Sequence, residues 1–327
     1  MPRSLLTLLN ITVTLVAMLA MHTATRSSFL KSSAFLRPSL LSSIFTNANT
    51  FSSAPSFKKH AHAKHPTPYL LPLLSSRSTG TDNSKILTFD SSQCGPLTDL
   101  SVPQGVKLIL NDKVKSYSPV NLPSYESHTI ELLVKPYPSV PSGGFGKFLC
   151  DLNIGETAPL IVKPDRQIHG STNVTNRWKS LCLLGGGTGI APLLQIARAN
   201  LANPQDPSSN KSQITMVSVN RGDDILMKEE IDALTQEHPD RFKVLYLDTS
   251  IGSRGTSQFI RSALNVTPNS PIPHDDELMI LICGSDGFVD YWAGGIVRDE
   301  SNKKVQGNLK GVLAEIEELV PEHVYKF

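Results

Sequence analysis

Residues 181–192 read Leu-Cys-Leu-Leu-Gly-Gly-Gly-Thr-Gly-Ile-Ala-Pro, so an apolar run passes into four glycines and then into a helical pattern. Glycine lets the backbone turn sharply and approach a ligand closely, and the N–H groups that open a helix favour an anion. Pro192 suits the first turn of that helix. The stretch therefore predicts a strand, a phosphate-binding turn and a helix, although its spacing differs from the dinucleotide motif G-x-G-x-x-G.

A second apolar run ends in a glycine-containing turn about ninety residues later, where a predicted strand at 277–282 precedes Cys-Gly-Ser-Asp-Gly-Phe at 283–288. The two motifs, in this order and at this distance, resemble the nucleotide-binding half of the ferredoxin-NADP reductase superfamily, most closely its NADH-cytochrome b5 reductase branch. The resemblance implies that Cys283 lies beside the nicotinamide and that the glycine loop holds the pyrophosphate. The residues it implies for nucleotide binding are Gly186, Gly187, Thr188, Gly189, Pro192 and Gly284.

The segments between these two motifs continue the resemblance. Residues 217–231 are similar to the family's next strand, polar turn and helix start, with Asp223 or Asp224 able to cap the helix. Another strand is expected at 242–248, and strands alternating with helices predict a parallel sheet covered on both faces, with the ligand at the carboxyl ends of the strands. We therefore expect an α/β NAD-binding domain over 178–327.

Asp248 bears on the choice of nucleotide. It lies where the resemblance implies an acidic residue against the adenosine ribose, which favours NADH because a carboxylate repels a 2′-phosphate. An aspartate that merely begins a loop fits the pattern equally well. The guanidinium of Arg221 is able to bind that 2′-phosphate instead. We therefore expect NADH as the nucleotide, with NADPH as the alternative.

An altered flavin signature precedes the nucleotide domain. A predicted strand at 106–110 leads into Lys115-Ser116-Tyr117-Ser118, which resembles the family's Arg-x-Tyr-Ser/Thr motif. The resemblance implies FAD, with Lys115 at the pyrophosphate, Tyr117 against the isoalloxazine ring and Ser118 near flavin N5. Catalytic roles fall to Cys283, Tyr117 and Ser118. Lysine keeps the charge of arginine but loses its bidentate fork, so phosphate affinity should fall.

Two further segments match the flavin half of the family. Residues 143–149 match the segment in which a Ser or Thr at a helix start binds the flavin phosphates, and Gly146 stands at that place. Glycine N–H groups are able to cradle an anion there, and a flexible hairpin loop is the other interpretation. Residues 129–137 alternate as a half-buried strand does and resemble the strand along the ribityl chain. The flavin contacts implied by these segments are Val134, Lys135, Gly144, Gly146 and Lys147.

Short strands with Pro and Gly turns predict an antiparallel six-stranded β-barrel for the flavin. Its earliest apolar runs, 69–74 and 86–89, are separated by a polar Ser/Thr/Gly stretch that is typical of a loop. We place the FAD-binding barrel at 66–176. Lys163-Pro164 replaces the Gly-Pro turn that follows the barrel in the family.

The first 65 residues have the composition of a targeting segment. No Asp or Glu occurs before Asp82, whereas eight basic residues and many serines do. We therefore expect residues 1–65 to be a presequence for the mitochondrial inner membrane or intermembrane space, with plastid entry through a bipartite signal as the alternative. The apolar run Leu5–Met21 is short for a membrane span and fits a presequence helix, a secretory signal or a marginal membrane anchor.

Charge and cysteine spacing exclude some classes of function. The chain has 31 basic and 29 acidic residues, and the eight early basic residues leave 23 against 29, a net charge of −6 for the remainder. An acidic body does not suggest nucleic-acid binding. The four cysteines show no Cys-x-x-Cys or Cys/His spacing, so no metal site is indicated.

These features together predict an NADH-dependent FAD reductase that passes single electrons to a haem protein of the cytochrome b5 or c type. The ending at 324–327 also resembles that of the family. The tail after Phe288 is longer than in the reductases and resembles a fungal mitochondrial subgroup linked to haem attachment on cytochrome c, so the acceptor stays open. Because Lys115 and Gly146 depart from the flavin motifs, the alternative is a flavin-poor, nucleotide-regulated mitochondrial assembly factor without reductase turnover.

Overall fold

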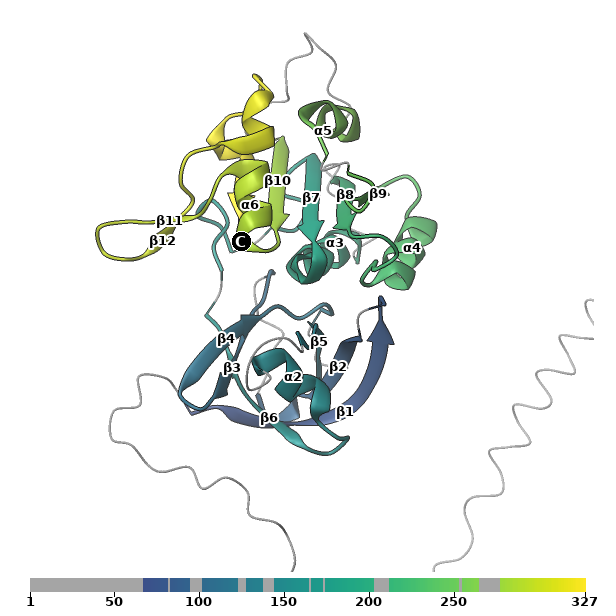
Figure 1. Ribbon diagram of the computed structural model, residues 1–327, viewed down its shortest axis with the longest axis vertical. Coiled ribbons are helices and arrows are strands. Elements are labelled where there is room, and N and C mark those ends of the chain that lie inside the picture. Colours follow the sequence, from purple (N-terminus) through teal and green to yellow (C-terminus); the bar gives the residue numbers. More distant parts are fainter. Residues whose placement is uncertain are drawn as a thin grey trace, which may run out of the picture. The chain divides into compact units, whose positions relative to one another are not determined.

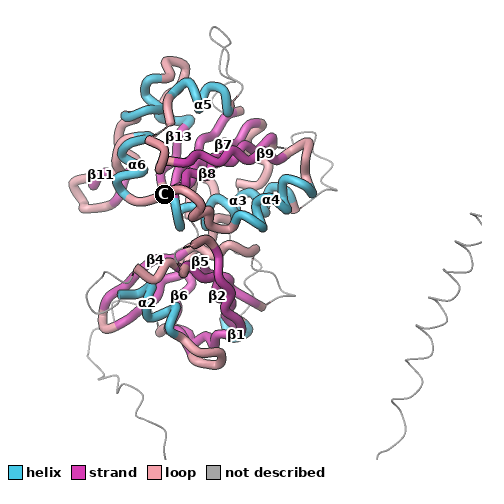
Figure 2. Tube along the Cα trace, turned by 45° about the vertical axis from the view of Figure 1, so that its right-hand side comes forward, coloured by secondary structure: helices cyan, strands magenta, loops and turns pink. Residues whose placement is uncertain are grey.

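The computed structural model describes residues 67–81, 83–94, 102–122, 128–137, 144–164, 166–172, 174–202, 212–252, 255–264 and 277–327. They form an antiparallel barrel followed by an α/β domain, and Figures 1 and 2 show the strands and helices of both. The expected presequence and its apolar run Leu5–Met21 lie outside the described residues. None of the described helices is long and apolar enough to cross a lipid bilayer.

The barrel has six strands, as expected. They are β1 (Tyr69–Thr79), β2 (Ser84–Asp90), β3 (Val106–Leu110), β4 (Lys113–Tyr117), β5 (Thr129–Val134) and β6 (Thr157–Val162). All pairings are antiparallel, in the order β4-β3-β6-β1-β2-β5, and a bridge between Pro119 and Leu132 closes the barrel between its two end strands. Alternate strand residues such as Leu71, Leu73 and Phe89 fill the core.

The polar stretch within the first hairpin is strand rather than loop. Residues 75–79 continue β1 and pair with residues 84–88 of β2, so the loop prediction for this stretch was wrong. Its side chains are mostly exposed, and the backbone ladder to β2 stabilises it without an apolar pattern. The turn begins at Gly80, whose φ of +66° favours glycine.

Helix α2 (Gly144–Asp151) packs on β2 and β5 and buries Leu149 and Cys150. Gly146 marks its closest approach to the barrel, because a β-carbon there would lie 2.1 Å from the carbonyl oxygen of Lys135. Any side chain at this position would therefore point into backbone. Glycine at residue 146 therefore permits α2 to pack closely against the end of β5.

The α/β domain is built on a parallel sheet in the order β13-β10-β7-β8-β9. Its strands are β7 (Ser180–Gly186), β8 (Gln213–Asn220), β9 (Phe242–Asp248), β10 (Leu278–Cys283) and β13 (Val324–Lys326). The helices are α3 (Ile190–Leu201), α4 (Lys228–Glu237), α5 (Ser257–Ala263) and α6 (Asp286–Ala293), and a short hairpin joins β11 (Val297–Arg298) to β12 (Lys304–Val305). Leu181 and Leu183 of β7 join the core beneath α3, whereas Cys182 and Leu184 join the core beneath α6. Both faces of the sheet are covered, as predicted.

The turn before α4 differs from the sequence prediction, because neither Asp223 nor Asp224 caps the helix. The N-cap is Met227, in the left-handed region at φ +58°, without a side-chain cap. Asp224 instead accepts a hydrogen bond from the Thr81 N–H (3.0 Å) and pairs with Lys135 (2.8 Å). Its carboxylate therefore binds two barrel segments, which local sequence does not show.

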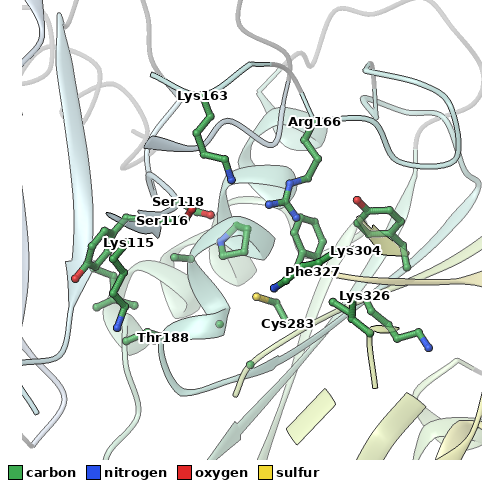
Figure 3. Close-up of a pocket in the computed structure, with 18 of the residues that line it drawn as sticks. Lys115, Ser116, Ser118, Lys163, Arg166, Thr188, Cys283, Lys304, Lys326 and Phe327 are labelled. Atoms are coloured by element: carbon green, nitrogen blue, oxygen red, sulfur yellow. The ribbon is translucent and has the colours of Figure 1, made fainter. Parts of the chain in front are cut away.

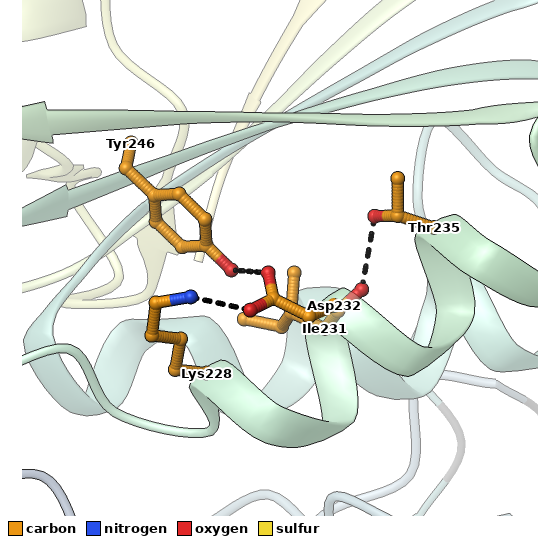
Figure 4. A network of polar contacts seen from close by, with 5 residues as sticks. All are labelled: Lys228, Ile231, Asp232, Thr235 and Tyr246. Carbon is orange, nitrogen blue, oxygen red and sulfur yellow. Dashed lines mark hydrogen bonds and ion pairs between the residues drawn. The ribbon is translucent and has the colours of Figure 1, made fainter.

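A polar network fixes α4 to the edge strand β9 (Figure 4). The Tyr246 hydroxyl donates to the Asp232 carboxylate at 2.6 Å, and Lys228 forms an ion pair with the same carboxylate. Burial and this hydrogen bond raise the pKa of Tyr246, so the phenol remains a donor. The network holds the helix that carries the Met227 turn.

Helix α3 also joins the two domains. The Gln104 N–H donates to the Gln195 side-chain oxygen (2.6 Å), and the Gln195 amide donates to the Asn121 carbonyl (3.0 Å). Arg198 donates to the Val120 carbonyl at 2.5 Å. The contacts are buried or half-buried, so the domains share a packed boundary.

Candidate functional site

A cavity of about 620 Å³ is lined by residues of both domains. The barrel contributes residues of β4 and β5, and the α/β domain contributes the turn after β7 and the ends of β10 and β13. Of the site residues predicted from sequence, the lining brings together Lys115, Tyr117, Ser118, Lys135, Thr188, Gly189, Pro192, Cys283 and Gly284. The other predicted residues lie outside this lining, namely Val134, Gly144, Gly146, Lys147, Gly186, Gly187 and Asp248.

The glycine turn has the geometry of an anion site. Gly187–Gly189 form one 3-10 turn after β7, and α3 begins at Ile190, two residues before Pro192. Gly187 has a φ of +54°, a region that favours glycine. The Ile190 N–H already donates to the carbonyls of Gly187 and Thr188, and Pro192 has no N–H. The N–H groups that remain to face an anion are therefore those that open the 3-10 turn, where no side chain among the described residues forms a cap.

The two sequence motifs interlock, which explains why they occur together. A β-carbon at Gly189 would lie 2.3 Å from the Cys283 carbonyl oxygen. Gly186 and Gly284 both make room for the Phe288 ring, which a β-carbon would approach to 2.7 Å and 2.4 Å respectively. The glycines therefore permit β7, α3 and β10 to meet closely at the edge of the cavity.

Cys283 and Tyr117 line the cavity as neutral groups. Burial raises the pKa of the Cys283 thiol to about 12, so the thiol remains protonated at physiological pH. A protonated thiol suits contact with a ring and not nucleophilic attack. Burial also raises the pKa of Tyr117, which keeps its phenol uncharged.

The cavity is rich in positive charge. Among the residues that the structure describes, the lining contains no aspartate or glutamate, and its cations are Lys115, Lys135, Lys163, Arg166, Lys304 and Lys326. The Lys115 ammonium lies 5.8 Å from the ring centre of Tyr137. Lys326 differs from the others, since its buried ammonium donates to the carbonyls of Ala293 (3.2 Å) and Asn308 (3.1 Å).

Sequence reasoning did not assign Lys163, Arg166 or Lys304 to the site. The first two follow β6, and Lys304 begins β12. In the sequence, Lys163-Pro164 was noted only because it replaces the Gly-Pro turn of the family, and no binding role was assigned to Lys163. Lys304 lies in the long tail, where no local pattern indicated a binding role.

The structure places Asp248 at the carboxyl end of β9, where it stabilises a turn. Its carboxylate accepts hydrogen bonds from the N–H groups of Ser250 (2.7 Å) and Gly222 (2.8 Å). These bonds lower its pKa. Its role toward the ribose stays a prediction, and so does the alternative role of the exposed Arg221.

Comparisons with known proteins agree with the motifs. The oxidoreductase NAD-binding domain family matches residues 183–293. NADH-cytochrome b5 reductase 2-A of Vanderwaltozyma polyspora is 31% identical over 237 residues, which cover 71% of this chain and 71% of that protein. NADH-cytochrome b5 reductase 2 of Chaetomium globosum is 35% identical over 217 residues, covering 65% of this chain and 57% of that protein's length. The chain belongs to the NADH-cytochrome b5 reductase family.

Solved structures support the two-domain fold. The cytochrome b5 reductase domain of Ulva prolifera nitrate reductase superposes with a TM-score of 0.58 at 19% identity, over 80% of this chain and 97% of that one. The CS-b5R domains of human Ncb5or, in an NAD+ form, give 0.55 at 19% identity, over 81% and 71%.

The family is one of FAD- and NAD(H)-binding reductases, and the cavity fits such groups. Its cationic lining complements phosphates, and the uncapped 3-10 turn that leads into α3 lies beside it. Tyr117, Tyr137 and Phe327 offer flat apolar faces for rings. Gly146 packs on Lys135, so α2 presents no side chain there for the flavin phosphates.

Proposed function

We propose that this chain is an NADH-dependent FAD reductase that supplies single electrons to a haem protein. One observation carries the proposal: the cavity joins the flavin signature at Lys115–Ser118 with the glycine turn and Cys283. These groups come from different domains and from segments far apart in sequence. Their convergence is what transfer between two cofactors requires.

When bound, NADH supplies a hydride, and FAD accepts it and releases electrons one at a time. The residues of the chain bind and orient these groups. Lys115 would pair with a phosphate, and the N–H groups that open the 3-10 turn at Gly187 would bind the second pyrophosphate. The neutral Tyr117 would cover a ring face. Cys283 would border the ring site as an uncharged thiol.

The acceptor and the location are part of the proposal. A haem protein of the cytochrome b5 or c type fits the names of the relatives and the long tail.

The acid-free composition before Asp82 supports mitochondrial targeting, with Leu5–Met21 as the proposed anchor and plastid entry as the alternative. Imaging of the full chain with a carboxyl-terminal reporter tests the location.

The second candidate is a flavin-poor, nucleotide-regulated assembly factor. It is favoured by Gly146, whose position in α2 leaves no room for the phosphate-binding side chain of the family. It is also favoured by lysine in place of arginine at residue 115. The glycine turn would still bind a nucleotide in that case.

Flavin content separates the two candidates. We expect the full chain, purified after FAD is supplied, to release flavin on denaturation and to be bleached faster by NADH than by NADPH. Fluorescence after denaturation and stopped-flow absorbance measure these two properties. A protein that releases no flavin would contradict the reductase proposal and favour the assembly factor. Equal rates, or a faster rate with NADPH, would contradict the role of Asp248 in nucleotide choice and point to Arg221.

Substitution of Cys283 tests the hydride path. Cys283→Ala is expected to slow bleaching by NADH by about tenfold or more, because a displaced nicotinamide loses near-attack geometry. Flavin content should stay the same, since the barrel holds the flavin. Rapid mixing at saturating NADH measures the rate. An unchanged rate would leave Cys283 as a small side chain that only packs against its neighbours.

A further inference from the structure

The tip of the first barrel hairpin is fastened to the turn that precedes α4. The Thr79 hydroxyl accepts a hydrogen bond from the Met227 N–H at 2.9 Å. The Thr81 N–H donates to one carboxylate oxygen of Asp224. A β-carbon at Gly80 would lie 2.5 Å from that same oxygen, so the barrel backbone packs directly against the carboxylate. The hairpin therefore fixes the position of Asp224.

Asp224 in turn holds a cation at the wall of the cavity. Its other carboxylate oxygen pairs with the Lys135 ammonium at 2.8 Å, and only 15% of the Asp224 side chain and 22% of the Lys135 side chain are exposed. Lys135 lines the cavity shown in Figure 3, together with Lys115 of the barrel and Thr188 of the glycine turn. Asp224 lies outside that lining. The ammonium is therefore held by a carboxylate that does not itself line the cavity.

A phosphate that binds Lys135 has to compete with this ion pair. A pair with little exposure is screened less by water than one at the surface, so the carboxylate offsets much of the positive charge that a ligand would meet. The lysine side chain is flexible, whereas the hairpin contacts restrain the Asp224 carboxylate. Lys135 is therefore the partner that is able to turn toward a ligand, and Asp224 draws it back.

We propose that Asp224 is a positioning residue that restrains phosphate binding by Lys135. It keeps the ammonium at the cavity wall and offsets its charge, so a dinucleotide binds less tightly and leaves more readily than it would from an unpaired lysine. The ligand is the pyrophosphate of NAD(H) or of FAD, the two groups that this family of reductases binds. The inference rests on the proposed function only for dinucleotide binding and not for electron transfer.

Calorimetric titration of the full chain with NAD+, and of the flavin-free full chain with FAD, tests the restraint. Asp224→Asn keeps an oxygen that accepts from the Thr81 N–H but removes the charge. It is expected to tighten binding of the dinucleotide that Lys135 contacts about three- to tenfold, and the dinucleotide that responds identifies the ligand. Asp223→Asn is the matched control, because it removes the same charge from the adjacent, exposed residue; its effect should stay below about twofold.

A double-mutant cycle shows whether the effect passes through Lys135. Lys135→Gln should weaken binding of the same dinucleotide about three- to tenfold. Asp224→Asn added to Lys135→Gln should change that affinity by less than about twofold, because no ammonium is left to release. Asp224→Ser repeats the comparison with a second neutral side chain if the asparagine variant does not fold.

Several outcomes would overturn the restraint: unchanged or weaker binding of both dinucleotides by Asp224→Asn, equal tightening by Asp223→Asn, tightening that persists beside Lys135→Gln, or loss of folding in both neutral variants of Asp224. The third would assign the effect to the field of the carboxylate alone, and the last would leave Asp224 a purely structural role. Tighter NAD+ binding with the expected variant pattern, but without flavin or turnover, would contradict the reductase proposal and keep the restraint. Turnover of NADH without this variant pattern would do the reverse.

Discussion

Gly146→Ser is expected to lower the free energy of unfolding by about 3 kcal/mol, rather than to restore a phosphate contact. A β-carbon at Gly146 would lie 2.1 Å from the Lys135 carbonyl oxygen and 3.4 Å from the Pro136 α-carbon. Both neighbours are backbone atoms, so no change of side-chain rotamer relieves the clash. Helix α2 would have to move away from β5, which would disturb the packing of Leu149 in the barrel core.

Urea unfolding followed by circular dichroism measures the effect, and FAD titration accompanies it. Lys147→Ser is the control, because it places the same residue one position further along α2 at an exposed site. It removes only the ion pair with Asp151, so a loss below about 1 kcal/mol is expected. A Gly146→Ser protein of full stability and higher FAD affinity would show that residue 146 faces the flavin phosphates.

Strands with continuous apolar runs were the elements that the sequence predicted best. The apolar run before the glycine turn became β7, and β9 has the predicted bounds. β7 is buried on both faces, so its composition alone marks it. β9 lies at the edge of the sheet and buries only Phe242 and Leu247, and its apolar residues were still enough to predict a strand. The polar half of β1 lacked this signal, because its exposed side chains carry no pattern and its partner strand stabilises it. Asp224 was misassigned because its partners, Thr81 and Lys135, come from the barrel.

Only the part of the candidate site that lies in local motifs could be predicted from the sequence. Cys283, Tyr117 and the glycine turn lie in motifs whose spacing is local. Lys163 comes from the connection after the barrel strand β6, and Lys304 comes from the hairpin of the tail. The cavity brings the two together across the two domains, and no short segment of the sequence shows that approach. The sequence showed that Gly146 departs from the family motif. It did not show the close contact between α2 and the Lys135 carbonyl that requires a glycine there.

Gly189→Ala is expected to destabilise the α/β domain by about 2–3 kcal/mol and to weaken NAD+ binding by more than about tenfold. A β-carbon at Gly189 would lie 2.3 Å from the Cys283 carbonyl oxygen and 2.6 Å from the Gly284 nitrogen. The φ of Gly189 is −63°, which any residue adopts, so the cost is steric. Relief of the clash would separate the start of α3 from the end of β10, and with them the anion-binding turn from the thiol.

Gly187→Ala in the same turn separates this steric effect from glycine's conformational role. Gly187 has a φ of +54°, and a β-carbon added there would meet no other atom within 4 Å, so alanine costs only about 1 kcal/mol of backbone strain. Urea unfolding and calorimetric titration with NAD+ compare the two variants. If Gly189→Ala lost no more stability than Gly187→Ala, the close approach of α3 to β10 would not be what glycine provides at residue 189. If Gly189→Ala lost more stability and also more NAD+ affinity than Gly187→Ala, nucleotide affinity would depend on the contact that joins the two motifs.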